Sequence, residues 1–162
     1  MRTKRFFYNS ISTAFYQIIS MITGLIIPRI MLKYYGSEIN GLVSSINQFI
    51  IYFNLVEAGL SSAAIYALYK PLADKDYESI NSIVSATRRF YIQSGLIFMS
   101  LVVGLAIVYP LYVRTELLNL SSVSFLVLIL GANGVLEFFT LAKYRVILTA
   151  DQRAYIISIA SL

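Results

Sequence analysis

Long apolar segments alternate with short polar ones along the whole chain. Four segments have almost no charge: residues 6–28 and 90–113 have none, residues 39–69 have only Glu57, and residues 117–142 have only Glu137. A helix of about 20 apolar residues crosses the hydrocarbon core of a bilayer. Since the runs do not alternate apolar with polar positions, they indicate membrane helices rather than barrel strands.

The pattern therefore predicts an all-α fold, a polytopic transmembrane helix bundle. The predicted spans are residues 6–32, 40–69, 91–113 and 117–144. Residues 154–162 begin a fifth apolar segment, which is too short to cross a bilayer. We therefore expect residues 1–162 to be the N-terminal transmembrane bundle of a longer protein.

The connections between the spans carry their own signals. Pro28 predicts a kink or local unwinding late in the first span, and Gly36 can take positive φ in a short turn. Residues 73–90 are the most polar part, with Asp74 as a candidate helix cap. At helical spacing, the charged residues of this stretch lie opposite an apolar face that comprises Tyr77, Ile80, Ile83, Val84 and Thr87. This arrangement predicts an amphipathic cytoplasmic connection that lies at the membrane interface.

Composition and charge agree with this interpretation. Hydrophobic residues make up 58% of the chain and charged residues only 13%, too few for the surface of a soluble domain. Of the 13 Lys and Arg residues, ten lie on one side of the predicted spans and three on the other. The positive-inside rule then places the N-terminus in the cytoplasm. The basic charge is explained by topology, so nucleic-acid binding is not expected.

Polar residues recur at helical spacing inside three of the spans. The members are Asn9, Thr13, Gln17, Ser20 and Gly24 in the first span, Asn40, Asn47, Asn54 and Ser61 in the second, and Asn133, Glu137, Thr140 and Tyr144 in the fourth. Such rows line either interhelical packing faces or a water-filled cavity. We expect these three spans to face one another and the third span to face lipid.

Charged residues inside the spans are the candidate functional groups, because an unpaired charge at mid-membrane costs at least about 2.5–3.5 kcal/mol. Glu57 is deep in its span and serves either a substrate, ion or proton pathway or a structural hydrogen bond. Glu137 is nearer the cytoplasmic end, where pairing with Lys143 or Arg145 is the alternative. Arg29 either turns toward a cavity or extends to the outer interface. The pathway candidates are Glu57, Arg29, Asn54, Asn47, Glu137 and Gln17.

Other chemistry is not indicated. The chain has no His and no Cys, which excludes thiolate or imidazole metal ligands within it, although a carboxylate ion site stays open. It has no Gly-rich phosphate loop and no nucleophile with its base. We predict neither enzymatic activity nor a cofactor.

Four segments in the first half of the chain form a recognisable series. They are Gly24-Leu-Ile-Ile-Pro-Arg-Ile-Met31, Tyr35-Gly36, Asn40-Gly-Leu-Val-Ser-Ser-Ile-Asn-Gln-Phe49 and Leu55-Val-Glu-Ala-Gly-Leu-Ser-Ser-Ala63. In this order they resemble the N-terminal part of bacterial polysaccharide flippases of the O-antigen or capsule type. These flippases belong to the multidrug/oligosaccharidyl-lipid/polysaccharide exporter superfamily. The strongest piece is the acidic-x-Gly-Leu-Ser pattern at residues 57–61, where family members often carry Asp instead of Glu.

The resemblance implies a two-bundle transporter in the bacterial cytoplasmic membrane that moves an undecaprenyl-diphosphate-linked oligosaccharide between leaflets for polysaccharide biosynthesis. It implies Arg29 as the cationic residue and Glu57 as the acidic one, with polysaccharide polymerase or ligase machinery as partners. Two alternatives stay open: a drug or lipid exporter of the same superfamily, and a small non-transporting membrane scaffold that uses residues 73–90 for docking.

Overall fold

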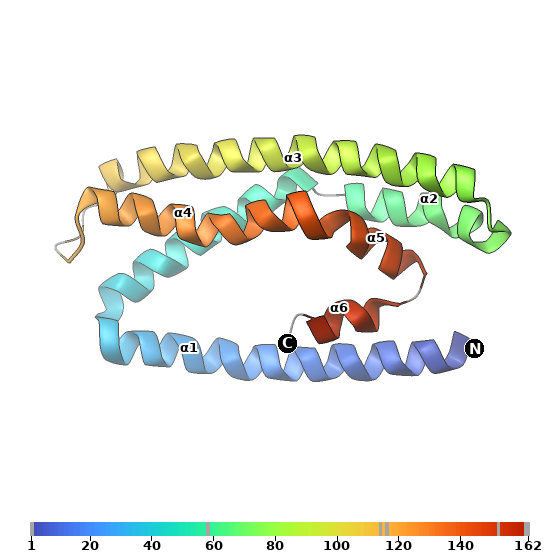
Figure 1. Ribbon diagram of the computed structural model, residues 1–162. Helices are drawn as coiled ribbons and strands as arrows, with labels where there is room; N and C mark the ends of the chain where they lie inside the picture. The colour runs from blue at the N-terminus through green and yellow to red at the C-terminus, as the bar shows by residue number, and fades with distance from the viewer. Residues whose placement is uncertain (1, 58, 114, 116, 152, 161–162) are drawn as a thin grey trace. The chain divides into compact units, whose positions relative to one another are not determined.

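The predicted all-α fold is confirmed. The computed structural model describes residues 2–57, 59–113, 115, 117–151 and 153–160, with the side chains of residues 2–6 and 141–143 outside the description. Of the described residues 93% are helical, and no strand occurs among them. Figure 1 shows the helices, which are α1 (Arg2–Phe53), η1 (Asn54–Glu57), α2 (Leu60–Asp74), α3 (Tyr77–Tyr112), α4 (Leu120–Leu136), η2 (Glu137–Leu141), α5 (Ala142–Ala150) and α6 (Ala154–Ala160).

The chain divides into two compact units that each draw on separated parts of the sequence. The first unit comprises Met1–Arg29, Gly59–Arg89 and Ala142–Leu162, and the second comprises Ile30–Ala58 and Phe90–Leu141. The long helices α1 and α3 each contribute to both units.

The first long helix turns at Gly36 and not at Pro28. Within α1, Gly36 has φ 78° and ψ 175°, outside the helical range, whereas Pro28 lies inside the helix. A left-handed φ strains any residue with a Cβ, and glycine avoids this strain. The predicted turn at Gly36 is confirmed. The unwinding predicted at Pro28 is wrong, because the residues around it keep helical angles despite the missing N–H donor.

The predicted connection over residues 73–90 is wrong as a separate element. α2 runs to Asp74, Lys75 takes a left-handed conformation (φ 54°), and α3 begins at Tyr77 and continues to Tyr112. Asp76, not Asp74, caps α3, because its carboxylate accepts the Ser79 N–H at 3.1 Å and the Ser79 hydroxyl at 2.6 Å. The connection thus reduces to a tight turn between two helices (Figure 1).

Most of the apolar face predicted for this region does exist. Ile80, Ile83 and Val84 are half-buried and Thr87 is buried, while Glu78 and Arg88 are exposed. The prediction that Tyr77 belongs to this face is wrong, because Tyr77 is 71% exposed in the first turn of α3. Thr87 satisfies its hydroxyl within the helix by donating to the Ile83 carbonyl at 2.7 Å. The amphipathic turns therefore contribute to the interior of the first unit.

Two helix contacts organise the first unit. Ala64 and Leu68 of α2 are buried, as are Val146 and Ala150 of α5, where the two helices meet. α6 lies against the N-terminal part of α1 (Figure 1), and Asn9 Oδ1 accepts the Tyr155 N–H at 2.8 Å. Thr13 Oγ1 and Ser158 Oγ lie 3.5 Å apart in the same contact. Part of the polar row of the first helix therefore faces α6.

An aromatic cluster and two glycines build the core of the second unit. The Phe98 ring is fully buried and lies 5.1 Å from the Phe138 ring, between centroids. Gly134 allows this approach, since a Cβ there would lie 2.6 Å from Phe98 Cζ. A Cβ at Gly131 would overlap Val102 Cγ1 in the same way. Small residues thus let α3 and α4 pack closely, as they do between membrane helices.

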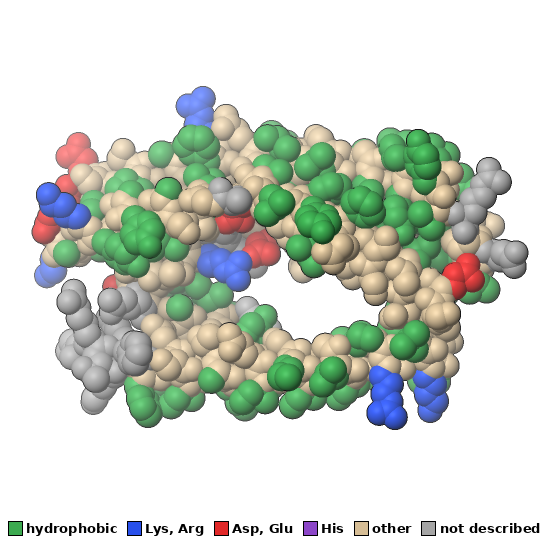
Figure 2. All heavy atoms as spheres, turned by 180° about the vertical axis from the view of Figure 1, so that it is seen from behind, with side chains coloured by type: hydrophobic (Ala, Val, Ile, Leu, Met, Phe, Trp, Pro, Cys, Tyr) green, Lys and Arg blue, Asp and Glu red, His purple; other side chains and the backbone are tan. Residues whose placement is uncertain are grey.

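Large apolar side chains are exposed on both units, which agrees with membrane insertion. Met21, Leu25 and Phe125 are 71%, 70% and 64% exposed. Figure 2 shows hydrophobic side chains spread over much of the visible face, with the charged ones gathered in a few places. In water such surface would drive association, whereas in a bilayer it contacts lipid.

Three helical segments among the described residues are long and apolar enough to cross a membrane: Phe7–Asp74, Tyr77–Tyr112 and Leu120–Thr140. The first segment contains both the first and the second predicted spans. In the most apolar part of Tyr77–Tyr112, which is α3, 39% of the residues are buried. In the most apolar part of Phe7–Asp74, none is buried. The expectation that the third span is the most lipid-exposed is thus wrong within this chain.

Candidate functional site

The second predicted span, residues 40–69, is broken in the middle. α1 ends at Phe53, a short 3₁₀ helix covers Asn54–Glu57, and α2 begins at Leu60. Gly59 has φ 87° and precedes α2, a left-handed conformation that stops an α-helix from continuing. Ala58 lies outside the described residues. The break therefore corrects the predicted continuous helix and leaves Glu57 at the end of a 3₁₀ turn.

Glu57 is held by a tyrosine of α3. The carboxylate is half-buried, and its Oε1 accepts a hydrogen bond from Tyr91 Oη at 2.8 Å. Tyr91 itself is only 2% exposed. A phenol that donates to a carboxylate offsets part of the cost of placing that acid among apolar helices. The pair joins two segments of the second unit that are 34 residues apart in the chain.

Sequence reasoning did not identify Tyr91. Its signal lay in the face that holds Ile83, Val84 and Thr87, because Tyr91 follows Thr87 by four residues and continues that face. The sequence predicts the start of a span at residue 91, and this boundary separates Tyr91 from the face. In the structure α3 runs without interruption from Tyr77 to Tyr112, so no helix boundary exists at residue 91.

The Tyr91 ring also lies near a π-turn of the chain. The Tyr91 ring lies 6.4 Å from the Phe138 ring, and Phe138 is buried within η2, the π-turn Glu137–Leu141. Gly95 of α3 leaves room for this turn, since a Cβ there would lie 3.0 Å from Phe138 Cβ. Single π-turns inside α-helices occur frequently at functional sites. Glu137 is half-buried at the first position of the turn.

The π-turn also breaks the polar row predicted for the fourth span. A π-turn adds one residue to the helical repeat, so residues beyond it rotate relative to those before it. Thr140 lies within the turn and donates its hydroxyl to the Leu136 carbonyl. Asn133 and Tyr144 are exposed on either side of the turn. The four polar residues of this row therefore do not share one helical face.

Two asparagines of the second predicted span, Asn47 and Asn54, lie away from the packed face, and Asn40 is half-buried. Leu42, Ile46 and Ile50 are the buried residues of that part of α1, whereas Asn47 is exposed. Asn54 is exposed in the 3₁₀ turn, three residues before Glu57. The break also separates Ser61, which belongs to the first unit, from the row that the sequence predicted.

Gln17 and Arg29 belong to the first unit and are both exposed on α1. A shallow groove of about 460 Å³ follows the same stretch of helix. Its lining includes the polar or small residues Tyr16, Ser20, Thr23 and Gly24. These candidates are therefore placed on an open helix surface, whereas Asn47, Asn54, Glu57 and Glu137 belong to the second unit.

The site centres on one acidic side chain, that of Glu57. Its acidic group is a carboxylate hydrogen-bonded to a buried phenol, and a carboxylate among apolar helices is typical of ion and proton pathways. Among the described residues, no group of three or more acidic, His or Cys side chains gathers to hold a metal ion. The arrangement provides one half-buried acid at a helix break.

Comparisons of the chain with models of protein families, with curated proteins and with solved structures found no match. The resemblance of the segments around Pro28 and Glu57 to polysaccharide flippases thus stays a prediction from the sequence.

Proposed function

We propose that this chain is the N-terminal bundle of a flippase that moves an undecaprenyl-diphosphate-linked oligosaccharide across the bacterial cytoplasmic membrane. The exposed apolar helices support a protein that works within a bilayer. The segment resemblance supports the substrate class and, with it, a place in polysaccharide biosynthesis beside polymerase or ligase machinery.

The observation that carries the proposal is the helix break at residues 54–59 with Glu57 beside it. Transporters commonly form substrate and ion sites where membrane helices are discontinuous, because unwound backbone and half-helix ends supply polar groups there. Here the break coincides with an acidic residue and its buried phenol donor, 2.8 Å apart. In this proposal Glu57 takes up a proton or cation during the transport cycle.

The proposal includes a topology of four spans with a cytoplasmic N-terminus. The turn at Gly36 would divide the Phe7–Asp74 segment into two antiparallel spans, with residues 33–38 outside. The distribution of ten basic residues against three supports the orientation. Arg29 would then lie near the outer surface.

The scaffold alternative receives less support. It needs the amphipathic stretch of residues 73–90 as a docking surface for a partner. Of its apolar face, Ile80, Ile83 and Val84 are half-buried inside the first unit, whereas Tyr77 is exposed. Most of the face that such a partner would need is therefore already in use within the chain.

The test is a substitution in the full-length protein in its own cell. We expect Glu57→Gln to reduce surface polysaccharide at least tenfold while the protein level in the membrane stays unchanged, because the amide cannot take up a proton. Glu78→Gln is the matched control, since Glu78 is exposed in the first turn of α3. Normal polysaccharide in the Glu57→Gln strain would refute the role of Glu57.

A further inference from the structure

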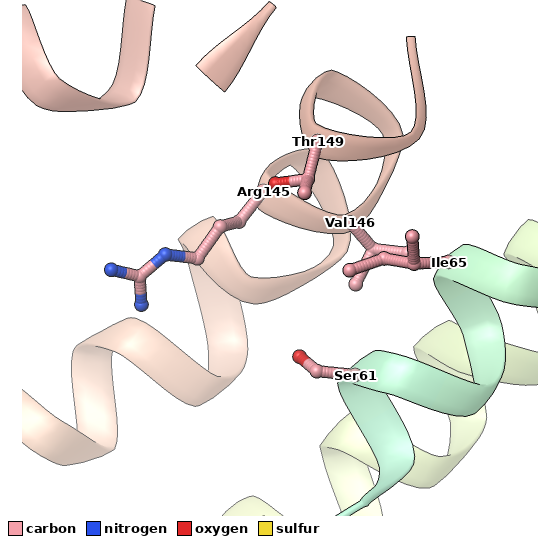
Figure 3. Close-up of a pocket in the computed structure, with 5 residues that line it drawn as sticks. All are labelled: Ser61, Ile65, Arg145, Val146 and Thr149. Atoms are coloured by element: carbon pink, nitrogen blue, oxygen red, sulfur yellow. The ribbon is translucent and has the colours of Figure 1, made fainter. Parts of the chain in front are cut away.

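A recess between α2 and α5 in the first unit combines one cation with two hydroxyl groups. It has a volume of about 260 Å³ and is lined by Ser61, Ile65, Arg145, Val146 and Thr149. Figure 3 shows the hydroxyls of Ser61 and Thr149 pointing to the side on which the Arg145 side chain extends. Ile65 and Val146 face each other and form the apolar wall. None of these residues belongs to the transport site proposed above.

The recess has a firm base. Val146 is only 2% exposed and Leu68 only 1%, and both lie where α2 packs on α5. Arg145 and Thr149 are four residues apart on α5, so they share a helix face. Ser61 and Ile65 have the same spacing on α2. The packing of the two helices therefore sets the positions from which the polar groups approach the recess.

The polar groups match a phosphate. A guanidinium has five N–H donors in a planar fork, so it can bind an anion in addition to another partner. Two hydroxyls lie beside it, and none of the described residues that line the recess is acidic. Ser61 also lies in the first turn of α2, where the positive end of the helix dipole favours negative charge. The recess is smaller than a typical pocket for a drug-sized ligand, which suits one head group.

We propose that this recess binds the phosphate group of an anionic molecule, with Arg145 as the charged contact and Ser61 and Thr149 as hydrogen-bond donors. Basic recesses between helices on the cytoplasmic side of a membrane bind anionic lipid head groups. Arg145 follows the fourth predicted span among the basic residues assigned to that side. A lipid phosphate is therefore the first source of the ligand, and free phosphate is the second. The proposal does not depend on transport.

The experiment uses the purified full-length protein in detergent and measures bound lipid by native mass spectrometry. Phosphatidylglycerol is the lipid probe, and inorganic phosphate in a thermal-shift series is the soluble probe. We expect Arg145→Gln to weaken phosphatidylglycerol binding roughly five- to tenfold, as expected for the loss of one cation near the membrane surface. Arg88→Gln removes the same charge from an exposed position outside the recess and should bind as the wild type does.

The two probes distinguish the sources. Loss of phosphatidylglycerol binding in Arg145→Gln without any response to inorganic phosphate supports a lipid head group. A phosphate-induced shift that Arg145→Gln abolishes supports a soluble phosphate compound. Equal binding by the wild type and Arg145→Gln, or equal loss in Arg88→Gln, would overturn the proposal. The double substitution Ser61→Ala with Thr149→Val keeps the charge and should weaken binding less than Arg145→Gln does.

Discussion

A carboxylate between apolar helices needs donors close to it, and Glu57 has one in Tyr91. The hydroxyl of this tyrosine lies 2.8 Å from the acid, while its ring packs against Phe138. The same side chain therefore links the helix break to the π-turn. At this scale Tyr91 positions the acid, and Glu57 is the group that would change its charge.

Replacing Tyr91 by Phe should destabilise the second unit by about 1–3 kcal/mol, because the ring is kept and Glu57 loses a donor. The unfolding midpoint of the purified protein in detergent measures this effect. Tyr109→Phe is the matched control, since Tyr109 is also buried and packs its ring 6.1 Å from that of Phe49. Identical midpoints for the two variants would contradict the role of the Tyr91 hydroxyl.

Asp76 gives the start of α3 a dependence on pH. The hydrogen bond from the Ser79 hydroxyl, followed by that from the Ser79 N–H, lowers the pKa of Asp76 below its usual value of 3.8. Because the folded pKa is depressed, the cap stabilises the helix end above pH 3.8 and is lost as the pH falls through the folded value. Amide exchange at residues 77–80, measured relative to the intrinsic exchange rate at each pH, should therefore accelerate only at acidic pH.

The variant Asp76→Asn separates this effect from general acid unfolding. Asparagine still caps a helix but does not titrate, so the acid-dependent acceleration at residues 77–80 should disappear. Asp74→Asn, at the end of α2, should leave it in place. An unchanged pH profile in Asp76→Asn would show that another group controls the helix end.

At the scale of elements, two glycines with positive φ set where the helices end. Gly36 turns α1 and Gly59 precedes α2, at φ 78° and 87°. Neither position is crowded, since a Cβ would meet no atom within 4 Å at either one. The requirement for glycine is therefore one of backbone conformation and not of space.

Gly36→Ala should cost about 1–2 kcal/mol of stability, because alanine resists the left-handed region. The control is Gly41→Ala in the following helical stretch, where the added Cβ is equally unhindered. It should be neutral or stabilising by up to about 1 kcal/mol. Thermal unfolding of both variants in the same detergent measures the difference. Similar midpoints would indicate that Gly36 does not need its left-handed conformation.

Close packing of α3 on α4 gives the second prediction at this scale. Gly131→Ala would force a methyl group into Val102 and should destabilise the second unit by about 1–3 kcal/mol. Gly104→Ala, in α3, adds the same methyl group where no atom lies within 4 Å. A midpoint for Gly131→Ala as high as that for Gly104→Ala would argue against this helix contact.

The helical content, the Gly36 turn and the inward face of residues 80–87 could be predicted, because periodicity and glycine placement act locally. The break at residues 54–59 could not, since an isolated glycine in an apolar run is also compatible with a continuous helix. The π-turn at residues 137–141 changes the helical register by one residue without a compositional signal. The Glu57–Tyr91 contact joins segments 34 residues apart, so only the packed fold shows it.

At the scale of the whole molecule, the exposed apolar surface and the scarcity of charge agree on a membrane protein. The described helices supply three segments long enough to cross a bilayer, and the first contains two predicted spans separated by the Gly36 turn. The absence of cysteine makes this arrangement accessible to experiment, since any introduced cysteine is the sole thiol of this part of the protein.

The most direct measurement is translocation of a lipid-linked oligosaccharide by the full-length protein reconstituted in vesicles. Substrate that reaches the opposite leaflet is detected by an added impermeant reagent that modifies its sugar. We expect the wild type and Glu78→Gln to move the substrate at similar rates, and Glu57→Gln to move it at least tenfold more slowly. A wild-type rate equal to that of protein-free vesicles would contradict the flippase proposal, and equal rates for the wild type and Glu57→Gln would contradict the site.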